Sequence, residues 1–246
     1  MTLDIKEIMD YCYCPKLYKL RSDKDKPTLL EKYNQALYNV YFTYLRAFQN
    51  NTLVRTFEYL KDEWAKEWIT DNDLHSITIK PVNVNRDIYS VRRVTGFDAI
   101  CNFDKLLKGD QFPIVIDEPY EVNIEGVTVT GTWHYIRELH NGINKRIQLI
   151  KILPDNNRFI NASVIAKKDI EITAMAYAFK QTFKNDFDIV IIDPHRNSIK
   201  RTTRTEEDYD ILKDTVISCA LSIKHNLNCY SPDVKCWSCD YRNHCL

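Results

Sequence analysis

The stretch VTVTGTWHYI, residues 127–136, decides the fold that we expect of this chain. Its side chains alternate between apolar and polar, after a turn-forming Glu125-Gly126 pair. Alternation with a period of two residues indicates a half-buried β-strand. The segment RIQLIKIL, residues 146–153, follows the turn-forming sequence HNGIN. We therefore expect two adjacent antiparallel strands, with the β pattern beginning at about residue 87.

Helical patterns precede these strands. Residues 28–49 open with Thr28 and Glu31 at capping-box spacing and continue with apolar residues at helical intervals, which predicts a long helix. A second apolar stripe contains Trp64 and Trp68, and we interpret both side chains as core residues.

The segment after the strands alternates between helix and strand. Residues 169–183 predict a helix capped by Asp169, residues 187–193 a buried strand, and residues 206–227 a long amphipathic helix. No repeat, low-complexity segment or flexible linker marks a second domain. We expect one α/β domain over residues 1–246, made of a mainly helical region at 1–80, a sheet-containing core at 85–195, and a C-terminal helix with a cysteine-rich tail at 205–246.

The composition is that of an ordinary globular chain. Apolar residues make up 44% of the 246, and 34 basic residues balance 34 acidic ones. Because the net charge is zero, nucleic acid would have to bind through a local groove. The N-terminus lacks a secretory pattern and no apolar run could cross a bilayer, so we expect a cytoplasmic protein without membrane contact. Richness in Asn, Lys, Ile, Asp and Tyr suggests an AT-rich genome, in which case a viral source would place the protein in the host cytoplasm.

Eight cysteines in a reducing compartment are expected to be thiols or metal ligands rather than disulfides. Three of them, Cys236, Cys239 and Cys245, lie within ten residues in the tail KCWSCDYRNHC. A metal is a plausible source of order there, and it needs a fourth ligand, from Cys14 or His244. Tetrahedral zinc and an iron–sulphur cluster both fit four thiolates. The remaining cysteines are interpreted as packing residues: Cys12, Cys101, Cys219 and Cys229.

Both cysteine segments resemble those of a known family. The pattern YxxCPxxYxL is matched by Tyr11, Cys14, Pro15, Tyr18 and Leu20, and the tail is similar to a terminal CxWCxYxxxC triplet. Together they resemble the iron–sulphur branch of the PD-(D/E)XK nucleases, which includes RecB-type and CRISPR-associated exonucleases and the nuclease domain of AddB. The resemblance implies a mixed central sheet flanked by helices, with the chain ends joined by a [4Fe-4S] cluster. Its implied ligands are Cys14, Cys236, Cys239 and Cys245, with zinc as the alternative occupant.

The same resemblance implies a GxxD motif on one strand and a (D/E)xK motif on the next, to hold Mg²⁺ or Mn²⁺. Gly131 is retained, but His134 stands where the aspartate belongs. Lys151 is retained, but Leu149 replaces the second carboxylate. Hard cations prefer oxygen ligands, so these positions predict an inactive site.

Two further positions of the family pattern lie on helices. Tyr38 or Asn39 stands near the expected histidine of the early helix. In the QxxxY pattern of the later helix, Thr173 replaces glutamine and Tyr177 is retained. An alternative is an active nuclease whose Mg²⁺ or Mn²⁺ ligands have moved to Asp98, Asp117 and Glu118.

Three functions therefore stay open. The first is an inactive relative of the iron–sulphur exonucleases that binds DNA, single-stranded or with a free end, or builds a replication, recombination or repair complex with a protein partner. The second is an active metal-dependent DNA exonuclease with displaced ligands, and the third a zinc-stapled protein-interaction module. Candidate phosphate contacts are Arg92, Arg93, Lys167, Lys168, Lys200, Arg201 and Arg204.

Overall fold

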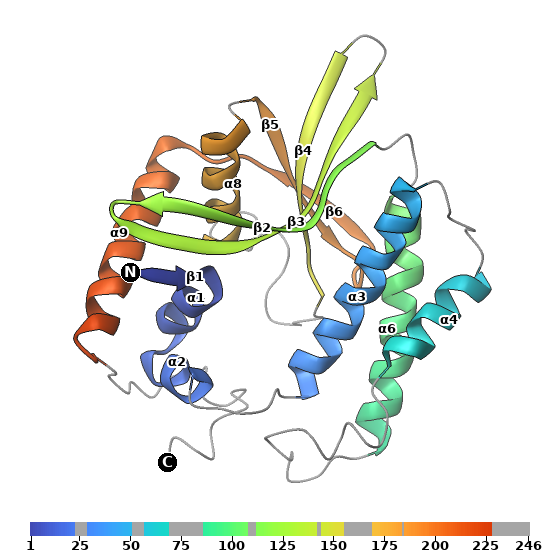
Figure 1. The fold of residues 1–246 in the computed structure, drawn as a ribbon. Helices are drawn as coiled ribbons and strands as arrows, with labels where there is room; N and C mark the ends of the chain where they lie inside the picture. The colour runs from blue at the N-terminus through green and yellow to red at the C-terminus, as the bar shows by residue number, and fades with distance from the viewer. Residues whose placement is uncertain are drawn as a thin grey trace.

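A computed structural model describes residues 1–22, 29–50, 57–68, 86–107, 112–141, 144–154, 169–183 and 185–227 of the chain (Figure 1). Its helices are α1 (Ile5–Tyr13), α2 (Pro15–Ser22), α3 (Leu29–Gln49), α4 (Phe57–Glu67), α6 (Arg86–Leu106), α8 (Ile170–Phe183) and α9 (Glu206–Lys224). Its strands are β1 (Thr2–Asp4), β2 (Phe112–Ile124), β3 (Val127–Asn141), β4 (Asn144–Ile152), β5 (Phe187–Asp193) and β6 (Ser198–Thr202).

The described strands form one mixed sheet of six strands in the order β1-β3-β4-β5-β6, with β2 also paired to β3. The meander β2–β3–β4 is antiparallel, and β5 returns parallel to β4 after α8. β1 adds to β3 in the parallel sense. The expected α/β class with helices flanking a mixed central sheet is thus confirmed, as is the pair of antiparallel strands.

Helices cover the sheet on both sides. Figure 1 shows α1, α8 and α9 on one side and α3, α4 and α6 on the other. The first side encloses a cluster of buried apolar residues, here the first core, that includes Ile8, Leu149 and Val216. The opposite side encloses the second core, which includes Leu37 and Ile150. Neighbouring residues of β4 therefore face different cores, as the pleat requires.

The two tryptophans expected in the core are buried there. Trp64 and Trp68 are 3% and 6% exposed, and both pack in the second core. Gly96 of α6 lies against Trp64 so closely that a Cβ at residue 96 would come within 2.4 Å of the ring. This glycine therefore allows α4 and α6 to approach each other.

The expectation that the β pattern begins at about residue 87 is wrong, because α6 occupies Arg86–Leu106. Phe97, Ile100 and Phe103 recur at three-residue spacing and pack on the second core. That helical period was masked by the β-branched residues around it, which carry a strand preference of their own. The helices and strand expected after the meander are confirmed as α8, β5 and α9.

β3 changes the core it faces part way along its length. Trp133 packs in the first core and Tyr135 in the second, although side chains two residues apart in a strand normally share a face. Their partners on β2 are Glu118 and Ile116, and between them Asp117 has a φ of 54°. The ribbon is therefore bent at this point, and His134 lies at the bend.

Within the described residues, no helix is long and apolar enough to cross a membrane.

Candidate functional site

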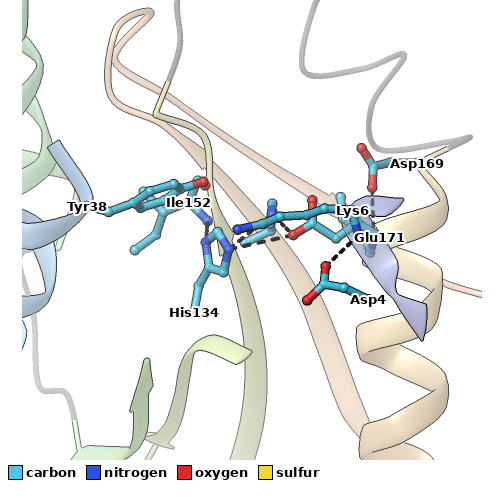
Figure 2. Close-up of polar contacts among 9 residues, drawn as sticks. Asp4, Lys6, Tyr38, His134, Ile152, Asp169 and Glu171 are labelled. Carbon is cyan, nitrogen blue, oxygen red and sulfur yellow. Dashed lines mark hydrogen bonds and ion pairs between the residues drawn. The ribbon is translucent and has the colours of Figure 1, made fainter. Parts of the chain in front are cut away.

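His134 and Glu171 approach each other in the interior, between β3, β4 and α8 (Figure 2), and Lys151 contacts both of them. Nζ of Lys151 lies 3.0 Å from Nε2 of His134 and forms an ion pair with Glu171. Oε1 of Glu171 is also 3.8 Å from Nε2 of His134. The three residues are 5%, 6% and 8% exposed, so the contacts form largely out of water. We call these three residues the buried triad.

The register of the meander brings His134 and Lys151 together. Tyr135 pairs with Ile150 across β3 and β4, so the preceding residue on β3 lies opposite the following residue on β4. Lys151 also shares a strand face with Leu149, which is buried in the first core beneath α8. Two positions that the sequence placed on neighbouring strands thus converge on one point.

Glu171 reaches this point from the first turn of α8. The helix starts there because Asp169 caps it: its side chain accepts a hydrogen bond from the Ile172 amide at 2.9 Å. The hydroxyl of Thr173 donates to the Asp169 carbonyl at 2.9 Å. Burial, and then the charge of Glu171, raise the pKa of the Asp169 carboxyl. The carboxylate that pairs with Lys151 thus belongs to Glu171 of α8, and not to the GxxD or (D/E)xK position on the strands.

His134 is held neutral. Burial, and then the ammonium groups of Lys151 and Lys6, hold its pKa well below the usual range. Both ring nitrogens also face donors, since the Ile152 amide donates to Nδ1 at 3.3 Å and the Lys151 ammonium faces Nε2. A neutral imidazole has one nitrogen that can accept a hydrogen bond from such a donor, whereas an imidazolium, with a proton on each nitrogen, has none.

Tyr38 of α3 closes the side of the site that faces the second core. Its ring centroid is 5.0 Å from that of His134, edge to face, and its hydroxyl donates to the Ile152 carbonyl at 3.2 Å. Burial, and then the charge of Glu171, raise the pKa of Tyr38 well above its ordinary value. Asn39 instead donates to Glu67 of α4 at 2.6 Å. Of the two early-helix candidates, the structure places Tyr38 at the site.

The other positions of the implied motifs have packing roles. Tyr177 stacks edge to face on Tyr209 of α9, with ring centroids 5.6 Å apart. The Thr173 hydroxyl accepts from Nε of Arg204 at 2.8 Å. Gly131 lies under Tyr120, whose ring would be 2.5 Å from a Cβ at residue 131.

The carboxylates of the displaced-metal alternative are not brought together. Asp98 is exposed on α6, and Glu118 is exposed on β2. Asp117 forms a 2.9 Å ion pair with Arg46 of α3. Across the described ranges, no group of three His, Cys, Asp or Glu side chains is placed to hold a metal ion.

The buried triad fits an ammonium better than a divalent cation. Mg²⁺ and Mn²⁺ need several oxygen ligands, whereas Glu171 supplies the one carboxylate paired with Lys151 here and Asp169 is engaged as a helix cap. An added cation would also be repelled by the Lys151 ammonium, and the Glu171 carboxylate alone could not neutralise both charges. The donor set therefore does not fit a catalytic Mg²⁺ or Mn²⁺.

Glu171 was missed by sequence reasoning, although a usable pattern was present. The segment IEITAMAYAF is apolar around nearly its whole circumference, and Glu171 is the acid within it. Charged residues are almost never buried unless they are paired. A lone acid in such a helix predicts a buried cation, and Lys151 is that cation.

Cys14 is the cluster ligand of the resemblance that lies in a described range. It is half-buried at the C-terminal cap of α1, and its amide donates to the Asp10 carbonyl at 2.8 Å. The hydroxyl of Tyr11, one turn earlier, donates to the carbonyl of Leu227, the last residue before the tail. The tail candidates lie outside the described residues: Cys229, Cys236, Cys239, His244 and Cys245.

The other cysteines differ from one another in exposure. Cys219 is 5% exposed in the first core, which confirms its expected packing role, and Cys101 is half-buried. The expected packing role is wrong for Cys12, which is exposed, with Sγ 3.5 Å from Sγ of Cys219. Cys12 lies one turn after Ile8, on the side of α1 that carries the buried residues Ile5 and Ile8, and no spacing in the sequence indicated its contact with α9.

The basic candidates are dispersed over the surface. The Arg92 guanidinium lies over the Tyr33 ring at 5.2 Å, and the exposed residues Lys200 and Arg201 follow each other along the edge strand β6, on opposite faces of it. Arg204 is engaged with Thr173. Lys167 and Lys168 lie outside the described residues.

Two arginines that the sequence did not single out, Arg137 and Arg146, lie with Arg201 on the second-core face of the sheet, beyond the apolar cluster. Arg137 is 9% exposed and donates through Nε to Gln148 at 3.0 Å, opposite it on β4. Burial lowers the pKa of Arg137, the adjacent Tyr135 opposes this shift, and the nearby charge of Arg201 adds to it. Arg146 forms a 3.2 Å ion pair with Asp188 on the same face. We call Arg137, Arg146 and Arg201 the arginine face.

In the described part of the chain, the arginine face has one ion pair, between Arg146 and Asp188. Among the described residues, no ion pair joins Arg137 or Arg201 to an acid. Moving a guanidinium out of water without a counter-charge is costly. The face is therefore suited to an anion.

Comparisons with known proteins add little to this geometry. No protein-family model and no curated protein matches the sequence. Among solved structures, the chain is similar to one described as the crystal structure of SSO0001, with 13% identity and a TM-score of 0.33. That match covers 96% of this chain and 90% of the other. At this identity and score the likeness supports no conclusion about activity.

Proposed function

We propose that this chain is an iron–sulphur, nuclease-like protein that binds DNA without cutting it, acting as a DNA-binding or complex-building subunit in replication, recombination or repair. The observation that carries the proposal is the position of the Lys151 ammonium, held between His134 and Glu171. A nuclease of the resembled family would use the same region for a divalent cation. Here the lysine supplies the positive charge and cannot activate water as a metal does.

The arrangement of elements supports the nuclease-like scaffold. A helix, α3, precedes the antiparallel meander β2–β3–β4, and α8 leads to β5, which runs parallel to β4. His134 and Lys151, which stand at the GxxD and (D/E)xK positions, lie 3.0 Å apart at their closest atoms. The resemblance requires these two positions to meet.

The arginine face supports a nucleic-acid ligand. Phosphate groups accept hydrogen bonds from guanidinium in a planar fork, and phosphate contacts supply most non-specific affinity for DNA. Arg201 is exposed on the edge strand β6, while Arg137 is held in place by Gln148. An exposed arginine beside a fixed one suits a phosphate backbone that runs along the sheet edge.

The cluster is proposed on the ligands of the resemblance. Cys14 would bind it together with Cys236, Cys239 and Cys245. The Tyr11 hydrogen bond to Leu227 brings the start of the tail to the helix that ends at Cys14, and Cys14 is a free thiol. Thiolates at these positions suit iron–sulphur or zinc coordination and would join the chain ends.

The decisive experiment combines metal analysis with DNA binding and cleavage. Protein purified without oxygen is expected to contain iron and sulphide, and Cys14→Ser to lose them. It should bind single-stranded or end-containing DNA at low salt and leave that DNA intact with Mg²⁺ or Mn²⁺.

Two other results would replace this proposal with an alternative. Cleavage that is abolished by Asp98→Ala or Asp117→Ala would establish the displaced-ligand nuclease. Stoichiometric zinc without iron, together with no DNA binding at low salt, would establish the zinc-stapled interaction module.

A further inference from the structure

Two cysteines from opposite ends of the described chain lie side by side at the surface. Cys12 is in α1 and Cys219 in α9, 207 residues apart in sequence. Their sulphur atoms are 3.5 Å apart, and both thiols are free. They lie in a pocket of about 430 Å³, which is also lined by Tyr11, Pro15, Asp214 and Ser218.

The two thiols differ in access. Cys12 is exposed, whereas Cys219 is 5% exposed within the first core. Both cysteines line the pocket, and Cys12 is the more accessible of the two to a small molecule bound there. Redox-active cysteine pairs need this division between an attacking thiol and a resolving thiol.

The separation of the sulphurs allows a bond after a small movement. The sulphurs of a disulfide are about 2.05 Å apart, so the two sulphurs must approach each other by about 1.5 Å. Rotation of the exposed Cys12 side chain moves its sulphur towards Cys219. The backbone of α1 is held next to α9 by the Tyr11 hydrogen bond to the Leu227 carbonyl. The helices thus keep the thiols in position without a prior bond.

We propose that Cys12 and Cys219 form a dithiol site that reduces a low-molecular-weight disulfide bound in this pocket and becomes an internal disulfide. The Cys12 sulphur attacks one sulphur of the small disulfide, whose S–S bond breaks and releases one small thiol. The Cys219 sulphur then attacks Cys12, which releases the second small thiol and forms the Cys12–Cys219 bond. Two protein thiols are oxidised, one small disulfide is reduced, and the two protons end on the released thiols.

The disulfide would restrict the movement of α1 relative to α9. It would join the two helices at Cys12, two residues before the proposed cluster ligand Cys14. In a reducing compartment the bond would be reversed by excess small thiol, so the state of the pair would follow the ratio of disulfide to thiol. The site does not depend on the proposed DNA binding, and either can fail without the other.

The test uses the full chain, purified without oxygen and incubated with oxidised glutathione. Peptide mapping by mass spectrometry should find a Cys12–Cys219 disulfide, with two glutathione thiols released per chain. Cys219→Ser should stop at a glutathionyl group on Cys12. In Cys12→Ser, the remaining thiol of Cys219 should react at least about tenfold more slowly than Cys12 does in the unchanged chain. Cys101→Ser, which changes a half-buried cysteine of α6, is the matched control and should behave like the unchanged chain.

The unchanged chain alone can overturn the proposal, which matters if a variant folds poorly. A stable glutathionyl group on Cys12, or a disulfide between Cys12 and a cysteine other than Cys219, would contradict it. Faster alkylation of Cys219 than of Cys12 in the folded protein would do the same.

Discussion

Lys151 on β4 and Glu171 in the first turn of α8 form an ion pair whose side chains are 6% and 11% exposed. The pair joins the middle of the sheet to the helix that covers it. Because each charge is taken out of water, each depends on the other for compensation.

Removing one charge of the pair should destabilise the protein more than removing both. Glu171→Gln leaves the Lys151 ammonium buried without a counter-charge and should cost about 3–5 kcal/mol of unfolding free energy. The double change Lys151→Met with Glu171→Met should recover much of that loss, since it removes both buried charges. Urea denaturation monitored by circular dichroism measures each value.

The matched control for these substitutions at Lys151 and Glu171 is an exposed ion pair. Lys66 pairs with Glu63 on the surface of α4, so Lys66→Met should leave the urea midpoint nearly unchanged. If Glu171→Gln changed the urea midpoint as little as this control, Glu171 would not be compensating the buried charge of Lys151.

The free energy of unfolding should fall in acid because of His134. Its pKa is lowered in the folded protein and returns to about 6.5 on unfolding, so the unfolded chain binds the extra proton. Stability from this residue is therefore complete above about pH 6.5 and is lost as the pH falls towards the folded-state pKa. The slope can reach about 1.4 kcal/mol per pH unit for one proton.

Replacing the imidazole should flatten that dependence. His134→Gln is expected to show a smaller change in unfolding free energy between pH 7 and pH 5, whatever its stability at pH 7. His140→Gln, at an exposed position of β3, should keep the slope. Equal slopes for all three proteins would contradict the neutral state assigned to His134.

The two neighbouring basic residues of β6 should differ in their effect on DNA binding. Arg201 lies on the arginine face, while Lys200 lies opposite Ile191 and points to the other side of the sheet. Arg201→Gln should weaken binding and reduce the slope of affinity against salt by about one counterion. Lys200→Gln should change neither, in fluorescence-anisotropy titrations at several salt concentrations.

Gly96 is expected to tolerate no side chain while Trp64 stays in place. A Cβ at residue 96 would approach the Trp64 ring to 2.4 Å, so Gly96→Ala should cost about 1–3 kcal/mol through overpacking. Combining it with Trp64→Phe should cost less than the sum of the two single changes, because the smaller ring relieves the clash. If the losses of unfolding free energy from the two single changes simply added, the contact between residue 96 and the Trp64 ring would not be the cause of the destabilisation.

The sequence predicted the elements whose period was uniform. The alternation of residues 127–136 and the apolar repeat of 28–49 were sufficient for β3 and α3, because burial on one face imposes those periods. α6 was missed because its helical repeat is interrupted by β-branched residues. Strand bending was also missed, since it depends on the backbone at Asp117 and not on composition.

The candidate site was predicted in part for a related reason. The meander placed His134 and Lys151 on adjacent strands, and their register then fixed the contact between them. Glu171 belongs to a helix whose rotation about its axis is set by packing, so no local spacing connects it to Lys151. The arginine face likewise joins Arg137 and Arg146 of the meander to Arg201 of β6, which is far from them in sequence.

The parallel pairing of Thr2–Asp4 with residues 128–130 of β3, and the contact of α1 with α9, have a consequence for synthesis. Ile5 and Ile8 at the start of the chain fill the first core together with Leu212 and Val216 of α9. During translation those two isoleucines stay partly uncovered until α9, more than two hundred residues later, has left the ribosome. We therefore expect the nascent chain to acquire its protease resistance late, and to depend on chaperones that shield an apolar N-terminal segment.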